Sequence, residues 1–445
     1  MTEAQFLRQL PDDLQQPAAA AYQQLLAAGW SRATLRTHLE AFLAFPARFV
    51  GDAWLGGLAR QLAPMEDQLP ARDLPEWPAL APYDLGPARR LPVAVYGAVL
   101  PGAQAGLGLP NGAVLATRQA VIPRALGRDL GCRITLTVFS DRARPKEVRD
   151  CLSRQTRFGD DFFEETVEVP LFDDPAWATQ PLAGLLPLAR RRFGSSGTGN
   201  HFVDFGFFEP LEVLGTLRPG RRYQALLTHS GSRGLGLELA RHFHRLARRQ
   251  NPGLPRALRD WAWLSQDSPD YEPFWQAVKV CLTYSEASHR WLHERIAQTL
   301  GLTAILGLSC PHNFASLEDY RGQRAVVHRK GAIRLGPGEL GLMAGSMTAP
   351  TYLVRGRDDP KLLFSAAHGA GRLIGRSTAR RAYRGRAVAA SLGRVRVLQS
   401  APDEWPAVYH DVETVVTAHG PVLDRVGRFW PRVVRMCAPG FAAED

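Results

Sequence analysis

Short runs of β-forming residues between glycine-rich turns constrain the fold of this chain beyond residue 90. The predicted strands span residues 93–100, 112–123, 133–140, 223–230, 324–335 and 351–356. The predicted helices span residues 234–250, 271–300, 369–382 and 409–419. Strands and helices do not alternate regularly, so a doubly wound or barrel fold is not expected. The pattern predicts a mixed α/β (α+β) fold in which central sheets are flanked by helices.

The first 90 residues have a different composition. Residues 3–44 carry apolar side chains at helical spacing, and residues 63–92 are rich in proline and acidic residues, as in a linker. We therefore predict a helical N-terminal extension with a proline-rich linker at 1–90, followed by a main domain at 91–445.

The net charge of +11 comes almost entirely from arginine, because only four of the 54 basic residues are lysine. Arginine binds phosphate in bidentate fashion, so a basic excess favours a polyanionic partner. No apolar run is long enough to cross a membrane. The N-terminus lacks the basic start and apolar core of a signal peptide, so we expect a cytoplasmic protein.

Metal-binding side chains stand beside glycines or in irregular settings in five short stretches. These stretches are GRDLGCR (127–133), GSSGTGNHFVD (194–204), THSGSRGLG (228–236), CPHNF (310–314) and SAAHGAGR (365–372). Mixed sulfur, imidazole and carboxylate donors suit a divalent metal, and glycine-rich turns expose N–H groups to phosphate. The five cysteines form no CxxC pair, so buried free thiols are expected for most of them. The helical pair His289 and His293 is interpreted as structural or surface groups.

A phosphate-and-metal site on a basic protein suggests phosphoryl or nucleotidyl transfer. The chain has no Walker A motif and no GxGxxG motif opening a strand–helix unit. It also lacks the Lys-x-Asp-Gly signature of lysine-based nucleotidyl transfer, because Lys330 is followed by Gly-Ala-Ile. If a nucleotidyl group is carried covalently, His368 is the best placed nucleophile.

The stretches GTGNHF (197–202), HSGSRG (229–234), HNF (312–314) and HGAGR (368–372) together resemble the RtcB family of RNA-splicing ligases. The resemblance covers about Leu100 to Tyr409 and implies an RtcB-like catalytic domain. It implies a ligase that uses GTP and two Mn²⁺ per active site, in tRNA splicing or RNA repair. Such an enzyme joins an RNA 3′-phosphate or 2′,3′-cyclic phosphate end to a 5′-hydroxyl end through a histidine-linked GMP. We expect a monomer and leave a need for an activating protein open.

The resemblance also assigns roles to individual residues. His368 would be the guanylylated nucleophile. The implied metal ligands are Asp129, Cys132, His201, His229 and His312. The implied nucleotide contacts are Asn200, Phe202, Asp204, Asn313, Gly345, Ser346, Met347, Thr351, Gly369, Ala370, Gly371 and Tyr409. Phe202 and Tyr409 would sandwich the guanine, and Asp204 would read its edge. The implied RNA contacts are Arg233, Arg372 and Arg376.

The chain departs from the family pattern near the expected RNA end. Gly102 and Gln104 stand where the family has an aspartate and a histidine, Arg133 replaces a glycine, and Ala344 replaces a proline. The C-terminus, RMCAPGFAAED, lacks the family's final lysine. Two alternatives therefore stay open. One is a guanylyltransferase-like paralogue that caps a nucleic-acid 3′-phosphate without efficient sealing, and the other is a non-catalytic RNA-binding pseudoenzyme.

Overall fold

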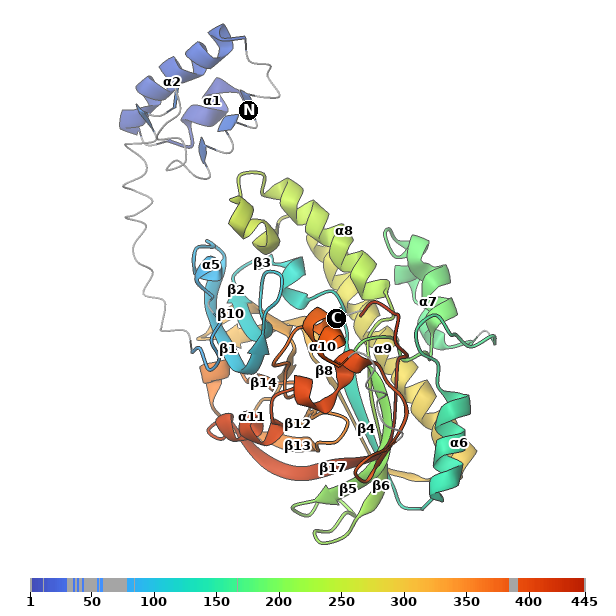
Figure 1. The fold of residues 1–445 in the computed structure, drawn as a ribbon. Helices are drawn as coiled ribbons and strands as arrows, with labels where there is room; N and C mark the ends of the chain where they lie inside the picture. The colour runs from blue at the N-terminus through green and yellow to red at the C-terminus, as the bar shows by residue number, and fades with distance from the viewer. Residues whose placement is uncertain are drawn as a thin grey trace.

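A large mixed sheet and a smaller antiparallel sheet form the centre of the protein (Figure 1). The structure, a computed structural model, describes residues 2–10, 12–29, 35–36, 38–39, 42–43, 54–55, 57–58, 78–83, 85–165, 167–383 and 391–443. Helices α6, α8 and α9 lie along one side of the sheets. The predicted mixed α/β class with central sheets and flanking helices is confirmed.

The largest sheet has nine strands within the described part of the chain. In spatial order these are β12 (Leu340–Met343), β13 (Thr351–Gly356), β17 (Leu423–Met436), β5 (Phe202–Pro210), β6 (Tyr223–Ser230), β4 (Arg133–Phe139) and β8 (Ala304–Pro311), with β16 (Val395–Gln399) and β15 (Ser391–Leu392) beside β17. The second sheet contains β1 (Ala94–Gln104), β2 (Asn111–Thr117), β10 (Gln323–Lys330) and β9 (Asn313–Tyr320). Two strand pairs complete the set, β11 (Ala332–Arg334) with β14 (Ser365–Ala367), and β3 (Ala120–Val121) with β7 (Leu264–Ser265).

The helices of the described residues differ widely in length. They are α1 (Glu3–Leu7), α2 (Asp12–Ala27), α5 (Gly86–Arg89), α6 (Pro145–Gln155), α7 (Leu186–Arg192), α8 (Leu235–Gln250), α9 (Tyr271–Leu300), α10 (Arg376–Ala382) and α11 (Val412–Ala418). The longest, α9, packs against β4, β6 and β8. None of the described helices is long and apolar enough to span a membrane.

The side chains of β6 point alternately to two faces, one packed against α9 and one lining the cavities described below. Successive side chains of a strand point to opposite faces, so Thr228 and Ser230 share a face and His229 takes the other. Thr228 Oγ1 lies 2.6 Å from Nδ1 of His289 and 2.7 Å from Nε2 of His293, and Ser230 Oγ lies 2.8 Å from Nε2 of His289. The two helical histidines are therefore buried structural groups, while His229 points into the cavities described below.

The N-terminal helices have a hydrophobic cluster of their own. Its buried members all fall between Phe6 and Leu58, whereas the main core begins at Leu85. The helical interpretation of 3–44 is confirmed for its described residues, and linker residues 63–77 lie outside the described residues. Chain segments before residue 90 already contact the main body, since Ala79 forms a bridge with Val99. The boundary at residue 90 stays a prediction.

Several predicted bounds match the structure and others need correction. Strands 223–230 and 351–356 and helix 271–300 have the predicted bounds. The predicted strand 324–335 is divided at Gly331, which has a φ of +61°. The predicted helix 409–419 begins only at Val412, after Asp411 caps its N-terminus. The five cysteines are buried and form no disulfide among the described residues.

The predicted helix 369–382 is wrong over its first seven residues, because α10 begins at Arg376. Gly371 has a φ of +73°, which a right-handed helix does not allow. A Cβ atom on Gly371 would also overlap the carbonyl oxygen of Gly102. Residues 369–375 are therefore not helical, and Gly371 lies directly against Gly102 of β1.

We expect Gly371→Ala to destabilise the protein strongly, because the new methyl group meets backbone in a left-handed conformation. The expected loss in the free energy of unfolding is at least about 2 kcal/mol, measured by urea denaturation. Gly307→Ala is the matched control, since a Cβ there meets nothing within 4 Å and its φ is not in the left-handed region. Equal stability of the two variants would contradict the close approach of Gly371 and Gly102.

Candidate functional site

Backbone hydrogen bonds join the segments that carry the predicted site residues. The N–H of His312 donates to the carbonyl of Cys132 (2.9 Å), and the N–H of Ala332 donates to the carbonyl of His312 (3.0 Å). The N–H of His368 then donates to the carbonyl of Gly331 (3.2 Å). These bonds fix the four segments side by side at one edge of the sheets.

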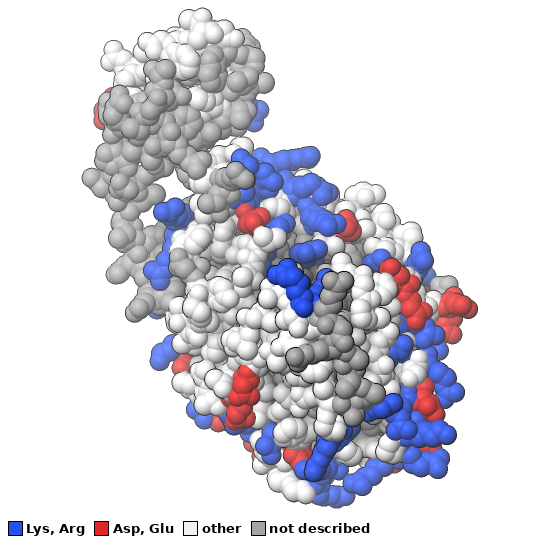
Figure 2. All heavy atoms as spheres, viewed as in Figure 1, with Lys and Arg blue, Asp and Glu red and all other residues white. Residues whose placement is uncertain are grey.

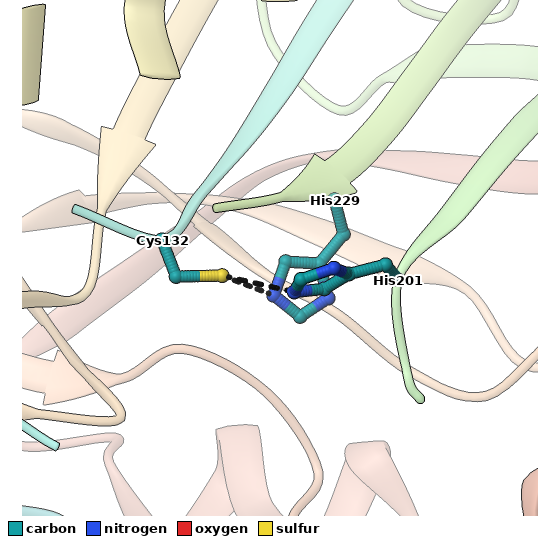
Figure 3. A group of neighbouring side chains, drawn as sticks. All are labelled: Cys132, His201 and His229. Atoms are coloured by element: carbon teal, nitrogen blue, oxygen red, sulfur yellow. Dashed lines mark hydrogen bonds between the residues drawn. The ribbon is translucent and has the colours of Figure 1, made fainter. Parts of the chain in front are cut away.

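Cys132, His201 and His229 form a buried cluster of metal-binding side chains (Figure 3). The Sγ atom of Cys132 lies 3.5 Å from Nε2 of His201 and 3.2 Å from Nε2 of His229. Cys132 and His201 precede β4 and β5, whereas His229 lies near the end of β6. Because β4 and β5 both run antiparallel to β6, these strand ends lie together.

Asp129 and His312 extend the cluster on two sides. The Oδ2 atom of Asp129 lies 3.0 Å from Nε2 of His201, and Nε2 of His312 lies 3.2 Å from Nε2 of His229. The predicted ligands thus form two sets around Cys132, with Asp129 and His201 on one side and His229 and His312 on the other. All five predicted metal ligands come together in the structure.

The donors of this cluster fit bound divalent cations. Among the described residues, Oδ2 of Asp129 and Nδ1 of His312 are buried without a hydrogen-bond partner. The 3.0 Å contact of Oδ2 of Asp129 with His201 lacks hydrogen-bond geometry. Nδ1–H of His229 donates to the carbonyl of Asn200 (3.2 Å), so the Nε2 lone pair is directed at the cluster. Burial holds the pKa of His229 and His312 well below the ordinary value, and a neutral imidazole is the form that binds metals.

His368 lies beside this cluster, directly after β14. Its ring stacks on that of His312, with ring centroids 4.4 Å apart. Its Nδ1 atom lies 2.7 Å from the carbonyl oxygen of Gly331, so Nδ1 carries the proton and the ring lone pair is on Nε2. This tautomer suits a nucleophile, and the Gly331 carbonyl and the stack on His312 together fix the orientation of the ring.

A first cavity, the nucleotide-side cavity, opens on one side of His368. The predicted nucleotide contacts that line it are Asn200, Phe202, Asp204, Gly345, Ser346, Met347, Thr351, Gly369, Ala370, Gly371 and Tyr409. Asp204 is only 5% exposed there, and its Oδ1 atom has no hydrogen-bond partner among the described residues. Burial raises the pKa of Asp204 well above its ordinary value, which is the cost of an unpaired carboxylate at the wall of the cavity.

A second cavity, the metal-side cavity, opens on the other side of His368. The predicted metal ligands that line it are Asp129, Cys132, His229 and His312, and its cationic side chains are Arg124, Arg128, Arg241 and Lys330. His368 and His229 line both cavities. His368 therefore lies at the junction of the two cavities, where it faces both the nucleotide-side cavity and the basic metal-side cavity.

Asn313 lies in the metal-side cavity instead of the nucleotide-side cavity. Its Nδ2 donates to the carbonyl of Asp129 (3.1 Å), and its Oδ1 accepts from the N–H of Gly331 (2.8 Å). The side chain thus joins a metal ligand to the residue that orients His368. Lys330, which the sequence analysis considered only as a nucleophile, donates to the carbonyls of Leu107 and Leu109, and burial lowers its pKa to about 8.

Two buried acidic residues that the sequence analysis missed hold the predicted RNA-binding arginines. Glu404 accepts from Arg372 (3.5 Å) and, at shorter range, from Arg376 and the hydroxyl of Tyr409. Asp403 accepts from Arg376 (3.2 Å). The guanidinium of Arg372 also lies 5.1 Å from the centre of the Tyr409 ring, so one face of that ring is covered. The only sequence signal was an acidic pair, in PDEWP, within what looked like an ordinary loop.

Arg233 lies deeper than its predicted role suggests. It is 1% exposed, and its Nε donates to Oγ of Ser195 (3.0 Å). A Cβ atom on Gly197 would come within 2.5 Å of its guanidinium. The structure therefore places Arg233 beneath the loop before His201, where it supports a predicted metal ligand.

The departures from the family pattern have local structural reasons. Gly102 has a φ of +74°, and a Cβ there would come within 2.6 Å of the carbonyl oxygen of Ala370, so an aspartate does not fit this backbone. Gln104 accepts from the N–H of Arg372 (3.1 Å) and lines both cavities. Arg133 points toward α9, where it forms an ion pair with Glu286 (3.1 Å). The change at 133 therefore leaves the metal-binding cluster intact.

Fold and site together define a mixed α/β protein with a buried cysteine–histidine–aspartate cluster and a histidine between two cavities. The chain belongs to the RtcB family, since the family model described as tRNA-splicing ligase RtcB matches residues 185–436. The resemblance seen in the sequence is thereby confirmed.

Curated relatives agree with this assignment. The RNA-splicing ligase RtcB of Escherichia coli K12 is 26% identical over 371 residues, which cover 74% of this chain and 86% of the relative. RNA-splicing ligase RtcB2 of another Escherichia coli strain is 30% identical over 332 residues, covering 71% and 81%. The tRNA-splicing ligase RtcB of Thermococcus kodakarensis is 26% identical over 401 residues, covering 72% and 83%. At these identities the chain is a divergent member of the family.

We expect Glu404→Gln to destabilise the protein, because it removes the buried counter-charge of Arg372 and leaves Arg376 with Asp403 alone. The expected loss in the free energy of unfolding is about 3 kcal/mol, measured by urea denaturation at neutral pH. Glu413→Gln is a matched control, since Glu413 also contacts a tyrosine hydroxyl (Tyr352) and an arginine (Arg425) but is exposed. The control should lose no more than about 1 kcal/mol, and equal losses would contradict a special role for burial at Glu404.

Proposed function

We propose that this protein is a GTP- and Mn²⁺-dependent RNA ligase. It joins RNA 3′-phosphate or 2′,3′-cyclic phosphate ends to 5′-hydroxyl ends through a GMP group carried by His368. One observation carries the proposal: His368 lies at the junction of the two cavities, with its proton held on Nδ1 by the Gly331 carbonyl. RNA ligation is also what the names of the family relatives state.

In the proposed first step, Nε2 of His368 attacks the α-phosphorus of GTP. A nitrogen–phosphorus bond forms, the bond to the β-phosphate oxygen breaks, and pyrophosphate leaves. A 2′,3′-cyclic phosphate end is first opened by water to the 3′-phosphate. An oxygen of the RNA 3′-phosphate then attacks the phosphorus of the GMP on His368, and the nitrogen–phosphorus bond breaks. The 5′-hydroxyl finally attacks the RNA 3′-phosphorus, loses its proton and displaces GMP. The small residues Gly369 and Ala370 leave the approach to the imidazole open.

Asp129, Cys132, His201, His229 and His312 would hold the two Mn²⁺ ions. Bound cations at this position would withdraw charge from phosphate oxygens and so favour attack at phosphorus. The chain's own contribution is the fixed arrangement of these donors and the neutral state of the buried histidines.

Guanine recognition is assigned to Asp204. Its buried carboxylate lacks a partner for Oδ1 among the described residues, and guanine offers two adjacent N–H donors that adenine does not. Binding of guanine would satisfy the carboxylate and offset the cost of its burial. With Arg372 over one face of Tyr409, the base would stack on the other face of that ring.

A second candidate is an enzyme that forms the histidyl-GMP and caps a 3′-phosphate without efficient sealing. The observation that favours it is the state of the arginines expected at the RNA end. Arg372 and Arg376 are bound by Glu404 and Asp403, and Arg233 is buried. The pseudoenzyme alternative has less support, because a pure RNA binder needs neither the metal ligands nor His368.

Labelling with α-³²P-GTP and Mn²⁺ tests the proposed intermediate. We expect protein-bound label that is lost in His368→Ala, because no other group replaces the attacking nitrogen, and lost in Cys132→Ala, because both ligand sets share this thiolate. Cys151→Ala is the control for loss of a buried thiol, since Cys151 lies in a separate hydrophobic cluster and should keep its label. Label that persists in His368→Ala sinks the proposal.

RNA with 2′,3′-cyclic-phosphate and 5′-hydroxyl ends is then added to the labelled protein. Joined RNA supports the ligase, and transfer of GMP to the 3′-phosphate without joining supports the capping alternative.

Asp204→Asn should weaken the preference for GTP over ATP, because an amide cannot accept both guanine N–H groups. We expect the rate of guanylylation at low GTP to fall roughly 10- to 100-fold, as for loss of a hydrogen bond to a charged acceptor. The assay compares labelling by GTP and by ATP, with Asp150→Asn on the exposed face of α6 as the control. Unchanged discrimination would remove Asp204 from guanine recognition.

A further inference from the structure

Helix α8 carries a row of exposed arginines that the proposed chemistry does not use. Its buried face, which includes Leu239, Phe243 and Ala247, packs into the main core. The exposed arginines of the helix are Arg241, Arg245, Arg248 and Arg249, and Arg259 follows in the next segment. We call these five residues the α8 basic strip.

The strip begins at the metal-side cavity and ends in a separate surface pocket. Arg241 lines the metal-side cavity, together with Arg124, Arg128 and Lys330. Arg245, Arg248, Arg249 and Arg259 line the pocket at the far end of α8. Figure 2 shows Lys and Arg side chains gathered at the end of the main body where α8 terminates. Positive charge is thus continuous from the reacting site to the surface.

Most of the strip has no acidic counterpart. Arg241 forms an ion pair with Glu238 (2.8 Å). Across the part of the chain that the structure describes, Arg245, Arg248, Arg249 and Arg259 have no carboxylate within ion-pair distance. The nearby acids are used elsewhere, because Asp260 pairs with Arg124 (3.3 Å) and Asp270 accepts from Gln250 (2.8 Å).

Helix-dipole compensation explains only part of this arrangement. Arg248 and Arg249 lie in the last turn of α8, where cations are favourable. Arg241 and Arg245 lie before the last turn, and Arg259 lies outside the helix, so the dipole does not account for them. Close unpaired cations repel one another, and a polyanion that binds them relieves the repulsion and releases its own counterions.

We propose that the α8 basic strip binds the phosphate backbone of the RNA strand whose reacting end occupies the metal-side cavity. This inference rests on the proposed ligase function. Arg241 to Arg249 spans about 12 Å at 1.5 Å per helical residue, which corresponds to roughly three or four nucleotides. Arginines that contact phosphates position a strand without reading its sequence, so the strip accepts RNA of any sequence.

The test compares two triple variants in an RNA-binding assay. Arg245→Gln/Arg248→Gln/Arg249→Gln removes three charges from the strip and leaves Arg241 at the cavity unchanged. Lys146→Gln/Arg149→Gln/Arg154→Gln removes the same charge from α6, which lies away from α8 in Figure 1. Binding of an RNA of about 20 nucleotides with a 3′-phosphate is measured by fluorescence anisotropy over a range of salt concentrations.

We expect the strip variant to bind this RNA at least about 10-fold more weakly at low salt. Its salt slope, the slope of log K against log salt concentration, should decrease in magnitude by about 2, at about 0.7 per lost phosphate contact. The α6 variant should stay within about 2-fold of the parent protein. Uridine 3′-monophosphate cannot reach beyond the cavity, so its inhibition constant, corrected for the RNA affinity of each protein, should be the same in all three proteins. Equal losses in both triple variants, or an unchanged slope in the strip variant, overturn the proposal.

Two further measurements keep the outcomes separate. The single variants Arg245→Gln and Arg248→Gln should each lower the salt slope by about 0.7, and they replace the triple variant if it does not fold. Guanylylation of the parent protein by GTP reports on the proposed function alone. If the parent protein takes up no label but the strip variant has a reduced salt slope, the ligase function is rejected and the RNA-binding surface is supported. If the parent protein is labelled but the strip variant has an unchanged salt slope, the RNA-binding surface is rejected and the guanylylation step is supported.

Discussion

The backbone ladder that runs from Cys132 through His312 and Gly331 to His368 is the interaction on which the site depends. It joins the start of β4, in the large sheet, to the β11–β14 pair, although Cys132 and His368 are far apart in the sequence. Because its members are N–H and C=O groups, their positions do not depend on side-chain rotamers. The ladder also supplies the carbonyl of Gly331, which fixes the tautomer of His368. Fold and nucleophile orientation are therefore set by the same hydrogen bonds.

The same ladder explains why the site has two cavities. His312 and His368 are held with their rings stacked, and this stack stands between the metal-side and nucleotide-side cavities. Carboxylates lie on both sides of it, Asp129 among the metal-binding donors and Asp204 in the nucleotide-side cavity. Each is buried and has an oxygen with no hydrogen-bond partner among the described residues. Buried carboxylate oxygens without a hydrogen-bond partner are uncommon in proteins, and a bound ligand can supply the missing contact.

Much of the fold was predictable from the sequence, and the exceptions have physical reasons. Strand 223–230 and helix 271–300 are bounded by turn residues, so local patterns sufficed. The helix predicted directly after His368 was wrong, because Gly371 adopts a left-handed conformation where it contacts Gly102. No local sequence pattern reveals this contact. The predicted metal ligands were identifiable only as a set, by resemblance. Glu404 was missed because its importance comes from burial against Arg372 and Arg376, which lie far from it in sequence.

Two groups of arginines near the two cavities differ in their surroundings. Arg372 and Arg376 are held by buried carboxylates near the nucleotide-side cavity, so their charge is already compensated and their geometry is rigid. Those on α8 are exposed and, beyond Arg241, form no ion pair with the described residues. A phosphate that approaches the first group must compete with Glu404, whereas one that approaches the second group meets only water and counterions. Affinity for a long polyanion should therefore come from the surface arginines more than from Arg372 and Arg376.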